Sequence, residues 1–98
     1  MSLLDLDLIS NAMPQAWKST VVGQVGDSNI KVLRMDEMSS AEEVHDYTEG
    51  LLVISGKLML GVGGEAISVG EGQIYLTEAG VPHAVLSGSH GTLVIIDI

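Results

Sequence analysis

Two stretches of the chain decide its fold: residues 43–56 read EVHDYTEGLLVISG, and residues 72–87 read GQIYLTEAGVPHAVLS. In each stretch, short apolar runs lie between glycines and a few ionisable side chains. Glycine accepts the positive φ angles of tight turns, and short runs of Val, Ile and Leu are typical of strands. The two stretches therefore predict short strands joined by tight turns.

Apolar runs bounded by turn residues continue on both sides of these stretches. The turn Gly26-Asp27-Ser28-Asn29 should join the first two runs as a hairpin. A turn signal about every eight to twelve residues, without a long segment of helical periodicity, is typical of a sandwich or closed barrel. The pattern predicts an all-β fold with little helix and roughly eight to ten strands. Besides a first strand near the N-terminus, the expected strands are 20–25, 30–35, 51–54, 57–62, 66–69, 73–77, 83–86 and 92–98.

The two ends of the chain carry different patterns. Leu4-Asp5-Leu6-Asp7-Leu8 alternates with a period of two, which predicts a half-buried strand or arm within residues 1–19. Residues 10–17 break this pattern and are expected to form a loop or a single helical turn. At the other end, Leu93-Val94-Ile95-Ile96 is apolar without alternation, so this run should bury both faces, either in the barrel wall or against a second subunit.

Length and charge limit the class of protein. Ninety-eight residues supply one core, so residues 1–98 are expected to be a single domain with the barrel over residues 20–98. The net charge of −9 disfavours nucleic acids and anionic membranes as partners. The absence of cysteine excludes disulfides and thiolate chemistry. The first ten residues contain no Lys or Arg, and no apolar run is long enough to span a bilayer, so a cytoplasmic location is expected.

The chain is also apolar for its size. Its mass is 10.3 kDa and its mean hydropathy is +0.38. A small barrel has difficulty in enclosing so much apolar surface, so we expect a homodimer, unless the N-terminal strand covers the apolar surface within the monomer.

The candidate site residues are Glu43, His45, Glu49 and His83. Glu43 and His45 are two residues apart, so on one strand they would project from the same face. Counting does not settle the direction of Glu49, which follows a predicted bend at Tyr47-Thr48. Two imidazoles and two carboxylates that converge in an aliphatic interior are costly as unpaired groups and favourable as ligands of a divalent cation.

The spacing of these residues resembles the two motifs of the cupin superfamily, whose members are jelly-roll β-barrels. Residues 43–56 resemble the first motif, H-x-H-x(3,4)-E-x(6)-G, and residues 72–87 resemble the second, G-x(5)-P-x-G-x(2)-H-x(3)-N. The resemblance covers roughly residues 32–98. Three residues depart from the motifs: Glu43 stands in place of the first histidine, Glu78 in place of the proline and Ser87 in place of the asparagine.

By this resemblance, His45, Glu49 and His83 are retained metal ligands, and Glu43 is a substituted one. A carboxylate can ligate iron, manganese, zinc or nickel, so the implied cofactor is a divalent transition metal. Another register would make His45 the first histidine of the motif and Tyr47 the second, but Glu49 would then come two residues too early. Glu43 has a second interpretation, as part of the acidic surface segment that begins at Asp36.

Three functions are open at this stage. The resemblance implies a module that binds a metal and a small molecule without turnover, or a metal-dependent enzyme similar to the dioxygenases, isomerases or decarboxylases of the family. The third function is an interaction protein with an inert interior. The missing first histidine and the lack of an evident second catalytic group favour the binding module. His90 is expected to be a solvent-facing turn residue outside the site.

Overall fold

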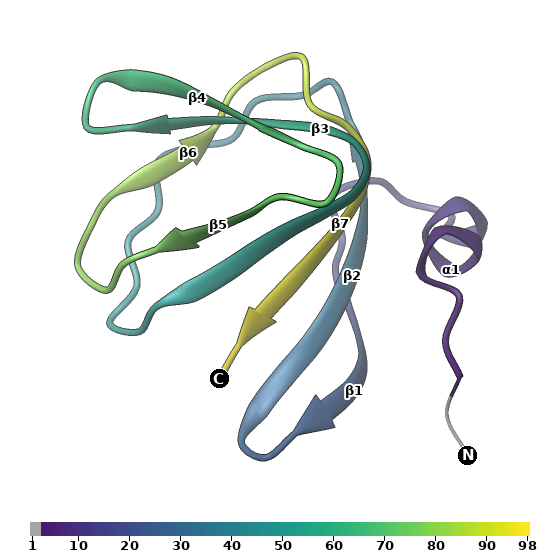
Figure 1. Ribbon diagram of the computed structural model, residues 1–98. Helices are drawn as coiled ribbons and strands as arrows, with labels where there is room; N and C mark the ends of the chain where they lie inside the picture. Colours follow the sequence, from purple (N-terminus) through teal and green to yellow (C-terminus); the bar gives the residue numbers. More distant parts are fainter. Residues whose placement is uncertain (1–2) are drawn as a thin grey trace.

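One short helix and seven antiparallel strands form the chain over residues 3–98, which the computed structural model describes (Figure 1). The strands curl around one interior, so the expected all-β barrel with little helix is confirmed, with seven strands over residues 3–98 where eight to ten were expected. Within residues 3–98, no helix is long and apolar enough to cross a membrane. The elements are α1 (Leu6–Ala12), β1 (Thr20–Val25), β2 (Ser28–Asp36), β3 (Glu49–Val62), β4 (Glu65–Gly70), β5 (Ile74–Thr77), β6 (His83–Val85) and β7 (His90–Asp97).

Strand β3 contributes to both walls of the barrel. The hydrogen-bonded order is β1-β2-β7-β3-β4, and β5 and β6 also pair with β3. The first half of β3 pairs with β7 and β5, whereas its second half pairs with β4 and β6. Figure 1 shows β3 bending as it crosses the barrel, so that two groups of strands enclose the interior.

A pair of glycines allows the bend of β3. The sequence predicts two strands, 51–54 and 57–62, but pairing with β7 continues between them, with a register shift just before Ser55. Gly56 has a φ of +79°, lies opposite Gly91 with a φ of +100°, and a Cβ on either glycine would overlap a backbone carbonyl of the facing strand. The two predicted strands are one, because this bulge turns the strand without interrupting the pairing.

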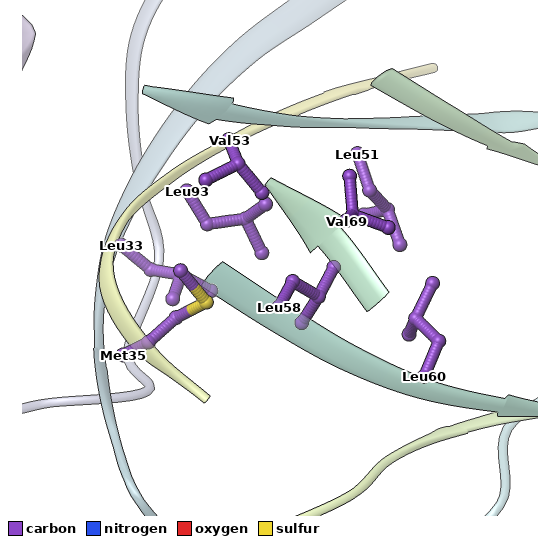
Figure 2. Close-up of a cluster of buried hydrophobic side chains, with 8 residues drawn as sticks. All are labelled: Leu33, Met35, Leu51, Val53, Leu58, Leu60, Val69 and Leu93. Carbon is purple, nitrogen blue, oxygen red and sulfur yellow. The ribbon is translucent and has the colours of Figure 1, made fainter. Parts of the chain in front are cut away.

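The bulge also changes which residues of β3 face the interior. Before it the buried side chains are the odd-numbered Leu51 and Val53, and after it they are the even-numbered Leu58 and Leu60. An extra residue in one strand produces this change of parity. These side chains belong to one buried aliphatic cluster, shown in Figure 2: Leu33, Met35, Leu51, Val53, Leu58, Leu60, Val69 and Leu93.

Leu6 and Leu8 lie in a helix and not in the predicted strand. Helix α1 begins at Leu6, and the Asp5 side chain caps it by accepting a hydrogen bond of 3.0 Å from the Leu8 N–H. The strand prediction for residues 4–8 was wrong because five residues are too few to fix a period: of the three leucines only Leu6 lies on the packed face, whereas Leu4 and Leu8 are 41% and 67% exposed. Residues 1 and 2 of the predicted arm lie outside the described residues. The helical spacing is visible in Leu6, Ile9, Ser10 and Met13, which are buried or half-buried along with Asp7.

Helix α1 packs outside the barrel on β2 and β7 (Figure 1). Val32 and Val94 pair on these strands and point to the outer face, because their neighbours Leu33 and Leu93 point inward. Both valines are nonetheless buried, at 0% and 3% exposure. The apolar run of β7 therefore buries both faces within one chain. Of the two alternatives for this run, the structure shows the barrel wall, with α1 covering its outer side.

Candidate metal centre

Backbone hydrogen bonds join Glu43 to His83. The Glu43 N–H donates to the His83 carbonyl at 2.7 Å, and the His83 N–H donates to the Glu43 carbonyl at 2.9 Å. This bridge lies at the start of β6. The two stretches that the sequence singled out therefore meet at one end of the barrel interior.

His83 is held in one orientation. Its side chain is 7% exposed, and its Nδ1 lies 3.3 Å from the Val81 carbonyl oxygen. A carbonyl only accepts hydrogen bonds, so this contact places a proton on Nδ1, and in the neutral ring Nε2 then presents its lone pair. Nε2 faces Oε1 of Glu49 at 3.7 Å. This is the arrangement in which a histidine ligates a metal through Nε2.

His45 reaches the same place from a loop. Its carbonyl accepts a hydrogen bond of 2.8 Å from the Gly80 N–H, and its ring stacks on Tyr47 with 5.0 Å between centroids. Its Nε2 lies 3.6 Å from Oε2 of Glu43 and 4.0 Å from Oε2 of Glu49. The shared strand expected for Glu43 and His45 is absent from the described residues, because Glu43 makes only an isolated bridge and the chain turns before β3.

Glu49 is the first residue of β3 and the more enclosed of the two carboxylates. Its side chain is 11% exposed, compared with 63% for Glu43. Burial raises the pKa of Glu49, and the neighbouring His45 and His83 oppose this shift. A buried carboxylate between two imidazoles favours a nearby positive charge.

The distances among these side chains fit one cation. Separations of 3.6–4.0 Å between histidine nitrogens and carboxylate oxygens are too long for hydrogen bonds. Metal–ligand bonds of about 2.0–2.2 Å place neighbouring ligand atoms about 3–4 Å apart. One ligand atom from each of Glu43, His45 and His83 lies within 4.8 Å of the others. Glu49 is outside that set of three but within 4.0 Å of both histidines.

The four side chains lie on the wall of a cavity of about 500 Å³. This volume is within the range of small-molecule sites. Leucines from both walls and Trp17 line much of the remaining surface. The interior of the barrel is thus partly open, and a small molecule in it would touch the histidine and glutamate cluster.

Sequence reasoning missed two charged residues of this cavity. Lys31 and Asp97 form an ion pair with 2.8 Å between Nζ and Oδ2, and their side chains are 26% and 3% exposed. The hydrogen bond to Asp97 raises the pKa of Lys31. The alternation of side chains along a strand could have identified them. Lys31 is on the same face of its strand as Leu33 and Met35, and Asp97 is on the same face as Ile95.

His90 takes no part in the cavity. It is exposed at the first position of β7 and is absent from the cavity wall, in agreement with the expectation from the sequence. It is the first residue of a strand and does not lie in the predicted turn, because the turn is formed by Ser87 and Gly88.

Known proteins share this fold. The family model described as Cupin domain matches residues 31–98. No curated protein sequence matches the chain. A solved structure of a cupin-2 domain containing protein from Shewanella frigidimarina has a TM-score of 0.88 at 21% identity, and the match covers 97% of this chain and 93% of that one.

Two further structures give the same result. A protein from Neisseria meningitidis has a TM-score of 0.84 at 16% identity, with 99% of each chain covered. A cupin superfamily protein from Desulfitobacterium hafniense has a TM-score of 0.77 at 17% identity, with 100% of this chain and 93% of that chain covered. At these identities the likeness concerns the fold alone.

Proposed function

The chain belongs to the cupin domain family, and on that premise we propose that it binds one divalent transition metal and a small molecule inside its barrel. The proposed metal ligands are His45, Glu49 and His83, with Glu43 as a fourth ligand. The observation that carries this proposal is the set of 3.6–4.0 Å separations between imidazole nitrogens and carboxylate oxygens on a cavity wall. When bound, the metal supplies a Lewis-acid centre at that wall.

The ligand set supports a hard divalent metal. Two neutral imidazoles and two carboxylates carry a formal charge of −2, which balances a divalent cation and offsets the cost of burying Glu49. Carboxylates are harder ligands than imidazoles, so the set favours iron or manganese. Zinc and nickel are also candidates, because the general affinity order places them above both.

Metal analysis of the purified protein tests the proposal. Protein purified without chelators, and then supplied with iron, manganese, zinc or nickel, should contain one metal per chain by mass spectrometry of the elements. The variants His45→Ala and His83→Ala should lose most of this metal and keep the circular dichroism of a β-barrel.

His90→Ala is the matched control, because this exposed histidine lies outside the cavity wall. It should keep the full metal content. Wild-type metal stoichiometry in both site variants, or no uptake by the wild-type protein in excess metal, would show that the site assignment is wrong.

A metal-dependent enzyme is the second candidate function. The observation in its favour is the cavity of about 500 Å³ that adjoins the cluster, since a substrate in it would lie beside the metal. Anaerobic loading with Fe²⁺, followed by oxygen-uptake measurements over a panel of small organic acids, distinguishes turnover from binding. The His83→Ala variant is the blank in this assay.

We also propose that the protein is a homodimer. Ile74 and Leu76 on the outer side of β5 are 48% and 57% exposed, and Ile98 is 67% exposed. With Gly50 and Ile96 these residues line a shallow groove on the outside of the barrel. A contiguous apolar patch on a small domain is typical of an interface, and a two-fold axis would bury the patch of both copies.

The remaining proposals concern location and excluded partners. We propose that the chain acts in the cytoplasm. We also propose that it binds neither nucleic acid nor anionic membranes, because its net charge of −9 repels both. Cell fractionation and binding assays with DNA and anionic vesicles check these points.

A further inference from the structure

The cavity is polar at one end and aliphatic at the other. Across β7, β3 and β5 the inner face carries Asp97, Glu49 and Thr77 in one row, because Gly50 pairs with Ile96 and Glu49 pairs with Thr77. Four residues further along, Leu93 pairs with Leu33. The aliphatic end of the cavity, called the floor below, is formed by Leu33, Leu58, Leu60 and Leu93.

Lys31 is fixed near the polar end. It pairs with Ile95 in the row between Asp97 and Leu93. Its ammonium donates to Oδ2 of Asp97 at 2.8 Å, and the buried Asp97 carboxylate also accepts a bond of 3.4 Å from Asn29. An ammonium has three N–H donors, and within residues 3–98 Asp97 is its one hydrogen-bond partner. Asp97 thus holds Lys31 in place and leaves donors for another acceptor.

The charges of the cavity wall depend on the metal. Three carboxylates, from Glu43, Glu49 and Asp97, oppose the single cation Lys31 among the described wall residues, which leaves a formal charge of −2. A divalent metal makes the wall neutral. An anion is therefore repelled by the metal-free cavity and accepted by the loaded one, where the metal and Lys31 both offer it positive charge.

From these observations we propose that the small molecule is a carboxylate with an apolar tail. Its carboxylate accepts hydrogen bonds from Lys31 beside the metal site, and its tail contacts the floor of leucines. The inference rests on the proposed metal site, and it adds two requirements: the ligand is an anion, and it binds after the metal. Coupling of this kind is reciprocal, so the carboxylate should also tighten metal binding.

The test uses 4-methylpentanoate as the probe, its amide as a neutral isostere and acetate as a carboxylate without a tail. Protein with and without Zn²⁺ is titrated by calorimetry and by the fluorescence of Trp17, the single tryptophan of the chain, which lines the cavity. Zinc-loaded protein should bind 4-methylpentanoate about tenfold or more tighter than the amide, the range of a charge-assisted hydrogen bond. Acetate should bind the zinc-loaded protein more weakly than 4-methylpentanoate does. The metal-free protein should also bind 4-methylpentanoate more weakly than the zinc-loaded protein does.

Variants assign this preference to Lys31. The double variant Lys31→Met/Asp97→Asn removes both charges together, so no carboxylate is left buried without its partner. It should keep zinc and lose the preference for carboxylate over amide. Lys31→Arg should retain the preference, and Lys57→Met, at an exposed position of β3, is the matched control.

The outcomes separate this inference from the proposed function. If the wild-type protein takes up no zinc or other metal, both fail. If metal binds but the amide binds as well as the carboxylate, or metal-free protein binds the carboxylate equally, the ligand class is wrong and the metal site stands. The comparisons on wild-type protein need no variant, so a double variant that fails to fold does not prevent a decision. Retained carboxylate preference in a folded double variant would show that the ion pair serves only to hold β2 on β7.

Discussion

At the scale of single residues, Glu43 and Glu49 have different surroundings although both face the site. Glu43 is mostly exposed, so its carboxylate can be solvated by water as well as bound to a metal. Glu49 is enclosed, and its two oxygens lie within 4.0 Å of one histidine each. Enclosure makes an unpaired Glu49 costly and a metal-bound one favourable. We therefore expect Glu43, the substituted motif residue, to be the weaker of the two proposed carboxylate ligands.

This difference predicts unequal losses of metal affinity. Glu49→Gln should weaken metal binding by about tenfold or more, whereas Glu43→Gln should have a smaller effect, because its position is open to replacement by water. Calorimetric titration with Mn²⁺ or Zn²⁺ measures both. Glu42→Gln, at an exposed position next to Glu43, is the control. A larger loss for Glu43→Gln would reverse the assigned order.

Ser10 is a second residue with an unusual environment. It lies in α1 with 0% exposure, and its hydroxyl oxygen has no hydrogen-bond partner among residues 3–98. A buried unpaired hydroxyl costs about 1–3 kcal/mol. The apolar contact between α1 and the strands would be better made by a methyl group.

Ser10→Ala should therefore stabilise the protein, by about 1 kcal/mol. Chemical denaturation gives the free energy of unfolding of the variant and the wild type. Because alanine also has a higher helix propensity, Asn11→Ala at the next, exposed position measures that contribution alone. A gain for Ser10→Ala no larger than that of Asn11→Ala would contradict this prediction.

At the scale of elements, strand β3 depends on the glycine pair that bends it. Gly56 and Gly91 both have positive φ angles, and each approaches the backbone of the other strand too closely for a side chain. The bend carries β3 from one wall of the barrel to the other and sets which of its residues face the interior. The leucines of the second half of β3 face the core because of the extra residue just before Ser55, next to this glycine pair.

Gly56→Ala should destabilise the fold by about 3 kcal/mol or more, since it combines a strained φ with a backbone overlap. Gly23→Ala on β1 is the matched control, because Gly23 has an ordinary φ and no atom within 4 Å of an added Cβ. It should change the free energy of unfolding by less than about 1 kcal/mol. Equal effects of the two substitutions in thermal and urea unfolding would show that the close approach of Gly56 to β7 is not required for stability.

At the scale of the whole molecule, the apolar surface is divided between two faces. Helix α1 covers the outer face of β2 and β7, so part of the apolar surface that suggested a dimer is buried within one chain. The outer face near β5 and the C-terminus remains exposed. The expected homodimer therefore rests on this second face.

Leu76→Lys should separate the proposed dimer, because an ammonium opposite its own copy is repelled and desolvated. Light scattering at micromolar concentration should give twice the 10.3 kDa chain mass for the wild type and the chain mass for the variant. Leu8→Lys, on the exposed side of α1, is the control and should remain dimeric. A wild-type protein that is monomeric under these conditions would contradict the proposed homodimer.

The sequence by itself determined most of the strands, the turns and the residue types of the candidate site. Alternating apolar residues and turn glycines express the preferences of the local backbone, so they can be found without knowledge of the fold. The spacing of His45, Glu49 and His83 could be compared with family motifs for the same reason. The helix at the N-terminus escaped this approach because five alternating residues are too few to fix a period, and packing on the outer face of β2 and β7 is not visible locally.

Only the tertiary structure decided which side chains meet. Lys31 and Asp97 are distant in sequence, and they pair because β2 and β7 are neighbours in one register. His45 points into the cavity because Gly80, from the second motif, holds its loop. The face of Leu58 depends on the bulge just before Ser55. Proximity and direction follow from long-range pairing, and a pattern within one segment carries no information about the register of another.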